Sequence, residues 1–276
     1  MRRRWSQAGM LLGATLFLHG IRSFQGRVML IGGRYETIRE LGRGGVGRTY
    51  LAEDTYRRGS PKCVVKKLQL PLKVPVLLEK ARTIFEEEAQ VLYRLGEHEQ
   101  IPRLFAHFEQ HGDFYLIQEL IDGHDLRQSF SLGDRWEEKA ILSFLREVLE
   151  ILDFVHQQSA IHQDLKPENL IRHWQDKKLA VIDFCSIKAI RNLIVNTAGE
   201  IGFSRPLGTP AYMPPEQAAG SPYCCSDLYA LGMMGIQVAT GYMPNQLPRN
   251  PETNNLEWHD QARISSNLAT VLDTMV

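Results

Sequence analysis

The sequence predicts an α+β fold of two lobes, in which a smaller β-rich lobe precedes a larger and mainly helical one. Between Tyr35 and Glu119, short runs of β-branched and aromatic residues alternate with turn residues, a pattern typical of antiparallel strands. From Glu137 onward, apolar residues recur mainly at helical spacing. The short segment Leu120–Gly123 joins these two parts. Because ligands bind preferentially in clefts between such units, we expect the functional site between the lobes.

Length and composition indicate a folded protein and point to no particular macromolecular partner. With 276 residues, the chain is long enough to bury substantial apolar cores. Its formal net charge is zero, so overall charge gives no argument for a nucleic-acid or membrane partner. The cysteines lack the C-x-x-C spacing of a zinc site, and we interpret them as reduced thiols of a cytoplasmic protein. They are Cys63, Cys185, Cys224 and Cys225.

Residues 1–33 differ from the rest of the chain, and we expect them to lie outside the fold. They are rich in arginine, and no acidic residue occurs before Glu36. The apolar run Met10–Leu18 is too short to span a bilayer, which requires about 20 apolar residues. Three interpretations are open: a start of translation at Met29 or a tail outside the fold, an amphipathic membrane-surface anchor, and an export signal. Membrane contact is expected only if residues 1–28 belong to the protein.

The smaller lobe is predicted to contain five strands and one long helix. The strands are Tyr35–Leu41, Thr49–Glu53, Cys63–Leu68, Leu104–Phe108 and Phe114–Glu119. The helix, Val76–Leu95, has an apolar stripe formed by Leu77, Ala81, Ile84, Phe85, Leu92 and Leu95. Glu88 falls on this stripe, and a carboxylate on a buried surface is costly unless it meets a cation. The pattern therefore predicts a buried lysine opposite Glu88.

The larger lobe is predicted to contain two helices and two short strands. The clearest helix is Glu137–His156, whose apolar face contains Ile141, Leu145, Val148, Leu149, Leu152 and Val155. Two short β-type runs follow, Leu170–Ile171 and Leu179–Ile182. After a long irregular stretch, the apolar segment Leu228–Thr240 predicts another helix.

A glycine-rich hairpin is the first motif with chemical meaning. Gly42, Gly44 and Gly47 form a G-x-G-x-x-G pattern between two predicted strands. This context argues against a dinucleotide-binding fold and a Walker-type loop, both of which place the glycines before a helix. Without intervening side chains, the backbone N–H groups of such a hairpin can approach phosphates. Alone, the pattern is more often found in a simple flexible turn.

A lysine on the third strand is the natural partner for the carboxylate of Glu88. Lys66 and Lys67 must lie on opposite faces of this strand, so only one of them can point into a cleft. A lysine paired with a helix glutamate is one way in which proteins hold a cation against nucleotide phosphates. We therefore expect Lys66 to pair with Glu88.

The stretch His162–Asn169, with the sequence HQDLKPEN, is the most specific motif of the chain. Asp164 and Asn169 lie five residues apart, and Asp183 follows within Ile182–Phe184. One aspartate that orients a hydroxyl, together with an asparagine and an aspartate that bind magnesium, forms a complete set for phosphoryl transfer.

In this order the motifs resemble the eukaryotic-type protein kinase family, in its bacterial, cyanobacterial-like serine/threonine branch. The resemblance covers about Arg34 to Val276. It implies the bilobal protein kinase-like fold, with a small lobe and hinge over 34–121 and a large lobe over 122–276. It also implies that the chain uses ATP and Mg²⁺ and phosphorylates proteins on serine or threonine. Its oligomeric state is not indicated.

The resemblance assigns residues to the nucleotide. Gly42, Gly44 and Gly47 would cover the phosphates, and Lys66, paired with Glu88, would contact the α- and β-phosphates. The remaining positions follow the same family pattern: Gln118 as the gatekeeper, Glu119 to Ile121 as the hinge that contacts adenine, and Asp125 at the ribose.

The resemblance also assigns residues to the transfer. Asp164 would be the catalytic base, Lys166 would stabilise the transferred phosphoryl group, and Asn169 and Asp183 would bind magnesium. Further members match the end of an activation segment and the aspartate that braces the catalytic loop: Gly208–Thr209–Pro210, Pro214–Pro215–Glu216 and Asp227. Lys166 and Thr209 favour serine or threonine over tyrosine as the acceptor.

Three substitutions depart from the family pattern within the motifs. Thr49 replaces a valine after the glycine loop and is also β-branched, so little effect is expected. Gln163 replaces the arginine that pairs with a phosphorylated activation loop, and glutamine cannot neutralise a phosphate. We therefore expect activity without loop phosphorylation. Cys185 replaces a glycine, which should restrict the motion of the segment while the carboxylate of Asp183 is retained.

The fourth departure concerns the C-terminus. The chain ends at Val276, where the resemblance places the end of the penultimate helix, so the large lobe is expected to lack its last helix. The arginine that pairs with Glu216 in the family would be absent, at a cost of several kcal/mol. Some apolar surface of the large lobe would be uncovered.

Three functions are compatible with these residues. The first is an active serine/threonine protein kinase, which the complete set of motifs favours. The second is a catalytically inactive, ATP-binding scaffold, which truncation or Cys185 would produce. The third is a small-molecule kinase of the aminoglycoside-phosphotransferase kind, against which the glycine loop, Lys166 and the segment Gly208–Glu216 argue.

Overall fold

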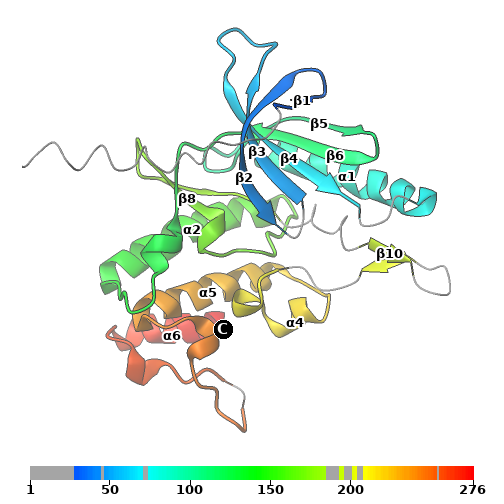
Figure 1. Ribbon diagram of the computed structural model, residues 1–276. Helices are drawn as coiled ribbons and strands as arrows, with labels where there is room; N and C mark the ends of the chain where they lie inside the picture. The colour runs from blue at the N-terminus through cyan, green and yellow to red at the C-terminus, as the bar shows by residue number, and fades with distance from the viewer. Residues whose placement is uncertain are drawn as a thin grey trace, which may run out of the picture.

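The computed structural model describes residues 28–44, 47–70, 74–184, 193–195, 201–203, 208–253 and 255–276. In this part of the chain, a six-stranded sheet and one long helix form the smaller lobe, and several helices form the larger lobe (Figure 1). The predicted α+β architecture of two lobes is confirmed. The expectations for the segment 1–27 lie outside the described residues.

The sheet of the smaller lobe is antiparallel, with the strand order β1-β2-β3-β4-β6-β5. The strands are β1 Leu30–Ile31, β2 Tyr35–Gly44, β3 Gly47–Asp54, β4 Lys62–Gln69, β5 Leu104–Gln110 and β6 Asp113–Glu119. All five predicted strands are present, and each is longer than predicted. The ladders continue into glycine and polar residues, which carry no apolar periodicity.

Strand β1 shows that the fold begins earlier than expected. Leu30 pairs with Glu36 and Ile31 with Tyr35, and Ile31 is buried. The turn between the strands is formed by Gly32 and Gly33, which have φ values of 60° and 66°. Glycine adopts this left-handed conformation without steric cost, and the chain reverses over the three residues between Ile31 and Tyr35. The expected extension over residues 1–33 is therefore corrected, because its last residues belong to the sheet.

Helix α1, Pro75–Leu95, covers one face of the sheet (Figure 1). Its buried residues include most of the predicted stripe, with Ala89 in addition and Ile84 only half-buried. Strand alternation divides β6 between two cores: Phe114 packs with α1, whereas Tyr115 packs on the opposite face. The rings of Phe85 and Phe114 lie with their centroids 4.9 Å apart. The helix is thereby fixed against the sheet.

The larger lobe follows a short connection and contains one small sheet and several helices. The sheet has the order β7-β8-β9. Its strands are β7 Gly123–Asp125, β8 Leu170–His173 and β9 Leu179–Val181. The helices are α2 Glu138–Gln157, α4 Pro215–Ala218, α5 Cys224–Thr240 and α6 Ser266–Met275. The short 3-10 helices are η1 Leu126–Phe130, η2 Pro167–Asn169, η4 Pro210–Tyr212, η5 Pro244–Gln246 and η6 His259–Gln261. A hairpin of β10 Leu193–Val195 and β11 Ile201–Phe203 completes the described elements.

Helix α5 forms the centre of the larger lobe. It is buried along almost its whole length, from Ser226 to Thr240, and both α2 and α6 contact it. A helix that is apolar on all sides is typical of the interior of a domain. Side chains at the first turn of α5, including Asp227, are therefore held rigidly.

One residue of α2 was wrongly assigned to the core. Leu149 is 38% exposed, whereas Phe144 and Ile151, which the predicted face omitted, are buried. The buried arc of α2 is centred on Val148 and Leu152, and Leu149 lies at its edge beside the exposed Leu142. An edge position is buried only where a neighbouring element covers it.

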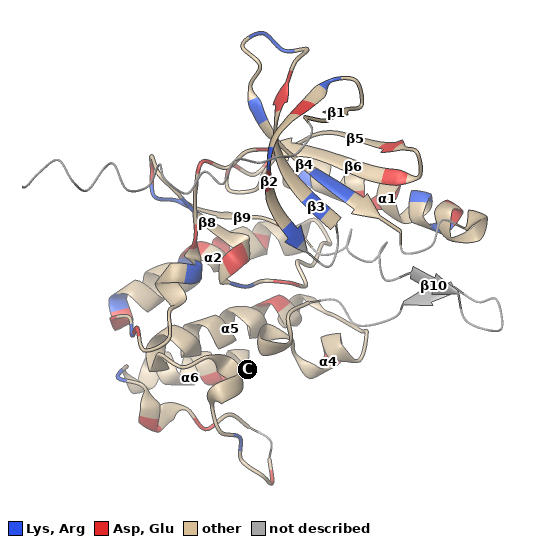
Figure 2. Cartoon of the chain, viewed as in Figure 1, with Lys and Arg blue, Asp and Glu red and all other residues tan. Residues whose placement is uncertain are grey.

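Charged residues of both signs are spread over both lobes (Figure 2). Among the described helices, none combines the length and the apolar character that crossing a membrane requires.

An ion pair closes the start of β2 onto the end of β3. Arg34 donates from Nε to Oδ1 of Asp54 and from Nη2 to Oδ2, both over 2.7 Å. Asp54 is 5% exposed, and the hydrogen bonds from Arg34 hold the pKa of its carboxyl below the ordinary value. Such bidentate pairs are stronger than neutral hydrogen bonds.

We predict that Asp54→Asn lowers the free energy of unfolding at neutral pH by about 1.5–3 kcal/mol, the range for hydrogen bonds to charged groups. Because the folded-state pKa of Asp54 is depressed, its stabilisation is present above the unfolded-state pKa of about 3.9 and is lost as the pH falls through the folded-state value. Urea unfolding of both proteins should therefore converge in acid. The exposed Glu36→Gln serves as the control, and equal losses in both variants would contradict the assignment.

Candidate active site

The buried carboxylate of Asp227 holds the 162–169 loop, which contains the HQDLKPEN motif. Asp227 is 1% exposed. Its Oδ2 accepts a hydrogen bond from the backbone N–H of His162 over 2.8 Å, and its Oδ1 accepts from the N–H of Gln163 over 2.9 Å. Nε2 of His156, at the end of α2, lies 2.9 Å from Oδ2. A buried carboxylate is tolerated only with such donors, so loop and α5 are fixed together.

His162 connects the same loop to the segment that carries Asp183. The ring is fully buried, and its Nε2 lies 2.9 Å from the carbonyl oxygen of Ile182. Because a carbonyl can only accept, Nε2 carries the hydrogen, and Nδ1 accepts from the N–H of Asp164 over 3.3 Å. The ring also packs on Phe184, with centroids 4.7 Å apart. The loop and the Asp183 segment therefore keep a fixed relation.

The predicted catalytic residues of the loop lie within one hydrogen-bonded group. Oδ1 of Asp164 accepts from the hydroxyl of Thr209 over 2.6 Å. Nζ of Lys166 donates to the same Thr209 oxygen over 2.8 Å and lies 3.1 Å from Oδ2 of Asp164. Asn169 donates from Nδ2 to the carbonyl oxygen of Asp164 over 2.8 Å. The group can hold a hydroxyl between a carboxylate and an ammonium group.

Lys66 reaches Asp183 from the smaller lobe. Its Nζ lies 2.5 Å from Oδ1 of Asp183. Lys67, the next residue, faces the other way and pairs with Asp113 over 2.8 Å, as strand alternation predicts. Glu88 is half-buried on α1, and its pairing with Lys66 stays a prediction.

Asp183 has a strained backbone, with φ at 65°. Non-glycine residues rarely adopt this left-handed conformation, and it persists where the surroundings enforce it. Here the hydrogen bond from Ile182 N–H to the carbonyl of Asn169, over 2.9 Å, holds the preceding residue. Strain of this kind is concentrated at functional sites.

Asn169 and Asp183 offer oxygen atoms suited to a magnesium ion. Asn169 is 4% exposed and uses its Nδ2 on Asp164, which leaves its side-chain oxygen as an acceptor. Asp183 already binds the ammonium group of Lys66, so its carboxylate is placed to take a cation. Amide and carboxylate oxygens are the hard ligands that Mg²⁺ prefers. The residues fit the predicted metal, and their role as its ligands stays a prediction.

The glycine hairpin is confirmed as the turn between β2 and β3. Gly44 pairs with Gly47 and Gly42 with Thr49. Gly47 has φ at 149°, and a Cβ there would lie 1.9 Å from the carbonyl oxygen of Lys67, so only glycine fits. A Cβ on Gly42 would meet no atom within 4 Å. The side of the hairpin that Gly42 faces is therefore open, and a phosphate could approach the backbone closely only if it were.

The residues predicted to contact adenine and ribose lie at the connection between the lobes. Gln118 is 5% exposed, and its Oε1 has no hydrogen-bond partner. Glu119 donates its N–H to the carbonyl of Arg103 over 2.9 Å, and Ile121 is nearly buried. Asp125 accepts two hydrogen bonds from the Arg127 guanidinium, which lower the pKa of its carboxyl. The roles of Glu119, Ile121 and Asp125 toward the nucleotide stay predictions.

The backbone of Gln163 is held from both sides. Its N–H is bound by Asp227, and its carbonyl oxygen accepts from Nε2 of Gln217 over 2.5 Å. Gly208, with φ at 120°, lets these groups meet, because a Cβ there would lie 2.4 Å from Gln217 Nε2. Gln163 itself has φ at 65°. A loop clamped in this way is held without any charged partner on the Gln163 side chain.

Sequence reasoning missed His156 and Gln217. His156 follows Val155 on α2 and is half-buried, so a polar residue beside the apolar face was the available signal. Nothing in the sequence distinguishes Gln217. Glu216, expected to lack its cation, is half-buried and accepts a hydrogen bond from the Ser226 hydroxyl over 2.8 Å. The expectation for Cys185 lies outside the described residues.

Comparison with known families identifies the fold and its relatives. A family model described as "Protein kinase domain" matches residues 35–275. Serine/threonine-protein kinase C of Synechocystis is 42% identical over 249 residues, which are 90% of this chain and 46% of that protein. Serine/threonine-protein kinase B of the same organism is 39% identical over 254 residues, which are 91% of this chain and 44% of that protein. The chain thus spans less than half the length of these relatives.

Solved structures agree on the fold. The crystal structure of the Mycobacterium tuberculosis PknI kinase domain aligns with a TM-score of 0.64, covers 87% of each chain and is 23% identical in sequence. At this level of identity the likeness concerns the fold alone. The predicted bilobal protein kinase-like fold is confirmed.

We predict that Asp227→Asn releases the 162–169 loop. An asparagine can accept only one of the two backbone hydrogen bonds with its oxygen, so a buried N–H loses its partner at a cost of about 1–3 kcal/mol. Urea unfolding should show this loss, and hydrogen exchange should accelerate at the amide of His162 or Gln163. The exposed Asp260→Asn should leave both measurements unchanged. Unaltered exchange in Asp227→Asn would show that the carboxylate does not hold the loop.

Proposed function

The chain belongs to the protein kinase domain family, and from this premise we propose that it is a serine/threonine protein kinase. It would transfer the γ-phosphoryl group of ATP to serine and threonine hydroxyls of other proteins. The relatives named serine/threonine-protein kinases B and C support this assignment, although this chain spans less than half of their length. The proposal therefore concerns the domain and its site.

One observation carries the proposal. The hydroxyl of Thr209 lies between the Asp164 carboxylate and the Lys166 ammonium group, at 2.6 Å and 2.8 Å. An aliphatic hydroxyl is thus bound by an acceptor for its proton and by a cation beside its oxygen. A protein serine or threonine presents the same chemical group. The arrangement supports Asp164 as the general base and Lys166 as the cation beside the transferred phosphoryl group.

The proposed transfer is an in-line displacement. A new bond forms between the acceptor hydroxyl oxygen and the γ-phosphorus, and the bond from that phosphorus to the oxygen bridging it to the β-phosphate breaks. The hydroxyl proton passes to Asp164, and ADP leaves. Lys66 contacts the α- and β-phosphates under the Gly42–Gly47 hairpin. The contribution of the protein is mainly positioning and electrostatic stabilisation.

Magnesium would be held by Asn169 and Asp183. When bound, the ion neutralises charge on the phosphates as the γ-phosphoryl group is transferred. Asn169 is oriented for this role by its hydrogen bond to the Asp164 carbonyl, and Asp183 by the fixed Ile182–Asn169 contact. The hinge residues Glu119 to Ile121 would bind adenine, and Asp125 the ribose.

The finer description of the enzyme follows from the same proposal. We assign it to the non-specific serine/threonine protein kinases, which act on protein substrates in signalling. We place the domain in the cytoplasm. Contact with a membrane surface depends on residues 1–28.

We predict that Asp164→Asn abolishes phosphate transfer without loss of the fold. Removing a general base costs about 10²- to 10⁴-fold in rate. The measurement is transfer of the γ-phosphate of radiolabelled Mg-ATP to a generic basic protein, with ATP affinity determined in parallel. The exposed Asp134→Asn is the matched control and should be as active as the wild type. A folded wild-type protein that binds ATP but transfers nothing would instead identify an inactive scaffold.

A further inference from the structure

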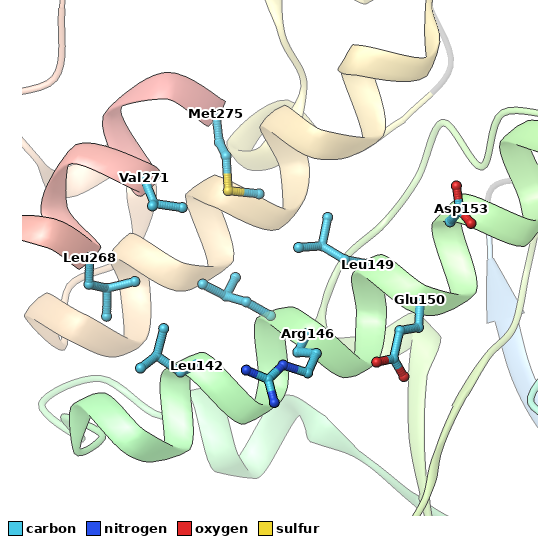
Figure 3. Close-up of a pocket in the computed structure, with 9 residues that line it drawn as sticks. Leu142, Arg146, Leu149, Glu150, Asp153, Leu268, Val271 and Met275 are labelled. Atoms are coloured by element: carbon cyan, nitrogen blue, oxygen red, sulfur yellow. The ribbon is translucent and has the colours of Figure 1, made fainter.

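Two features of the larger lobe lie outside the roles assigned above. One is an apolar groove between α2 and α6, whose lining side chains are drawn in Figure 3. The groove is bordered by the last helix of the chain, and nothing in the structure shows what covers it. The other is the ion pair of Asp125 and Arg127, next to the 162–169 loop. The geometry of this pair carries an inference.

The Asp125 carboxylate receives three hydrogen bonds from Arg127. Its Oδ1 accepts from the backbone N–H over 3.1 Å and from Nε over 2.8 Å. Its Oδ2 accepts from Nη2 over 2.7 Å. The side-chain hydrogen bonds lower the pKa of the Asp125 carboxyl, so the group is ionised and can only accept. An ionised carboxylate has about four acceptor positions, so the described contacts leave one of them open, on Oδ2.

The open position lies next to the residues proposed to bind ATP. Asp125 is the last residue of β7 and pairs with Ile171 of β8, a strand that begins directly after Asn169. Both β7 and the following η1 contact η2, the turn that contains Asn169. In the other direction, β7 begins two residues after the predicted adenine contact, Glu119 to Ile121. A nucleotide with its base at that connection and its phosphates near Asn169 has its sugar beside Asp125.

We propose that Arg127 is a positioning residue for ATP: it fixes the Asp125 carboxylate so that Oδ2 accepts a hydrogen bond from a ribose hydroxyl. The inference rests on the proposed kinase function and extends it to a residue outside the recognised motifs. A carboxylate without such a partner loses rotamer freedom when it binds a sugar, which weakens binding. The planar guanidinium holds both oxygens in one orientation before the nucleotide arrives.

A purely local role does not account for the whole pair. The backbone N–H of Arg127 already gives Asp125 the contact of an N-cap to η1, and this contact needs no guanidinium. The Arg127 side chain is 64% exposed, and ion pairs of exposed side chains contribute little to stability. The bidentate contact therefore has its main effect on the orientation of Asp125.

The test compares calorimetric binding of Mg-ATP with that of a Mg-dideoxy-ATP, which lacks both ribose hydroxyls. Arg127→Ala should weaken ATP binding about tenfold, equivalent to about 1.4 kcal/mol. It should leave dideoxy-ATP binding unchanged, because that nucleotide has no hydroxyl for Oδ2. In transfer assays, KM for ATP should rise about tenfold at nearly constant kcat, since the contact is the same in the ground and transition states.

The exposed Arg58→Ala, in the turn between β3 and β4, is the matched control and should bind both nucleotides like the wild type. Arg127→Ala keeps the backbone N–H that caps η1, and circular dichroism establishes that each variant is folded. Arg127→Lys retains the charge but not the planar fork, so it should weaken ATP binding nearly as much as alanine does. In an Asp125→Ala background, Arg127→Ala should cause no further loss.

Several results would overturn the inference alone: equal weakening of ATP and dideoxy-ATP, ATP binding by Arg127→Ala or Arg127→Lys as tight as that of the wild type or tighter, or additive losses in the double variant. Additive losses would mean that Arg127 acts on the nucleotide without Asp125. A folded wild-type protein that binds neither nucleotide would contradict the proposed function, and the inference with it. The two failures are thereby distinguishable.

Discussion

The candidate active site depends on one buried interaction, the carboxylate of Asp227 with the backbone of the 162–169 loop. Asp227 lies in the first turn of α5, the most deeply buried helix of the larger lobe. The packing of α5 in that core therefore fixes the position of the loop. Two N–H groups and the His156 ring converge on this carboxylate. Because a buried carboxylate without donors is costly, the loop cannot move without a large penalty. Asp164, Lys166 and Asn169 keep their relative positions for this reason.

The same loop brings the two lobes into one site. Its His162 and Asn169 bind the backbone of Ile182 from two sides, and the next residue, Asp183, meets Lys66 of the smaller lobe. A left-handed φ at Asp183 costs about 1–3 kcal/mol, which the surrounding contacts must offset. The site therefore exists only when both lobes and the loop are in place, and single contacts in it are not independent of one another.

Much of this arrangement follows from local sequence, and the rest depends on contacts between distant segments. Strands and helices were predictable because their apolar residues repeat at strand or helix spacing, and the 162–169 motif stands out by its residue types. Strand β1 was missed because two residues carry no periodicity and their pairing depends on the Gly32–Gly33 turn. Gln217 was missed because its partner, the Gln163 carbonyl, lies far away in sequence. Leu149 was wrongly assigned to the core because periodicity identifies the apolar face of a helix but does not show how much of that face a neighbouring element covers.

The central claim is that contacts within the fold hold the 162–169 loop, so that the glutamine at position 163 needs no phosphate partner. The most direct measurement compares the phosphate-transfer rate of the wild-type protein with that of a variant carrying alanine at Ser186, Thr197 and Ser204, before and after phosphatase treatment. Thr209 is left intact because its hydroxyl binds Asp164. The account predicts nearly equal rates in all samples. A drop of about a hundredfold, equivalent to about 2.7 kcal/mol, would contradict it, because the loop would then depend on a phosphate.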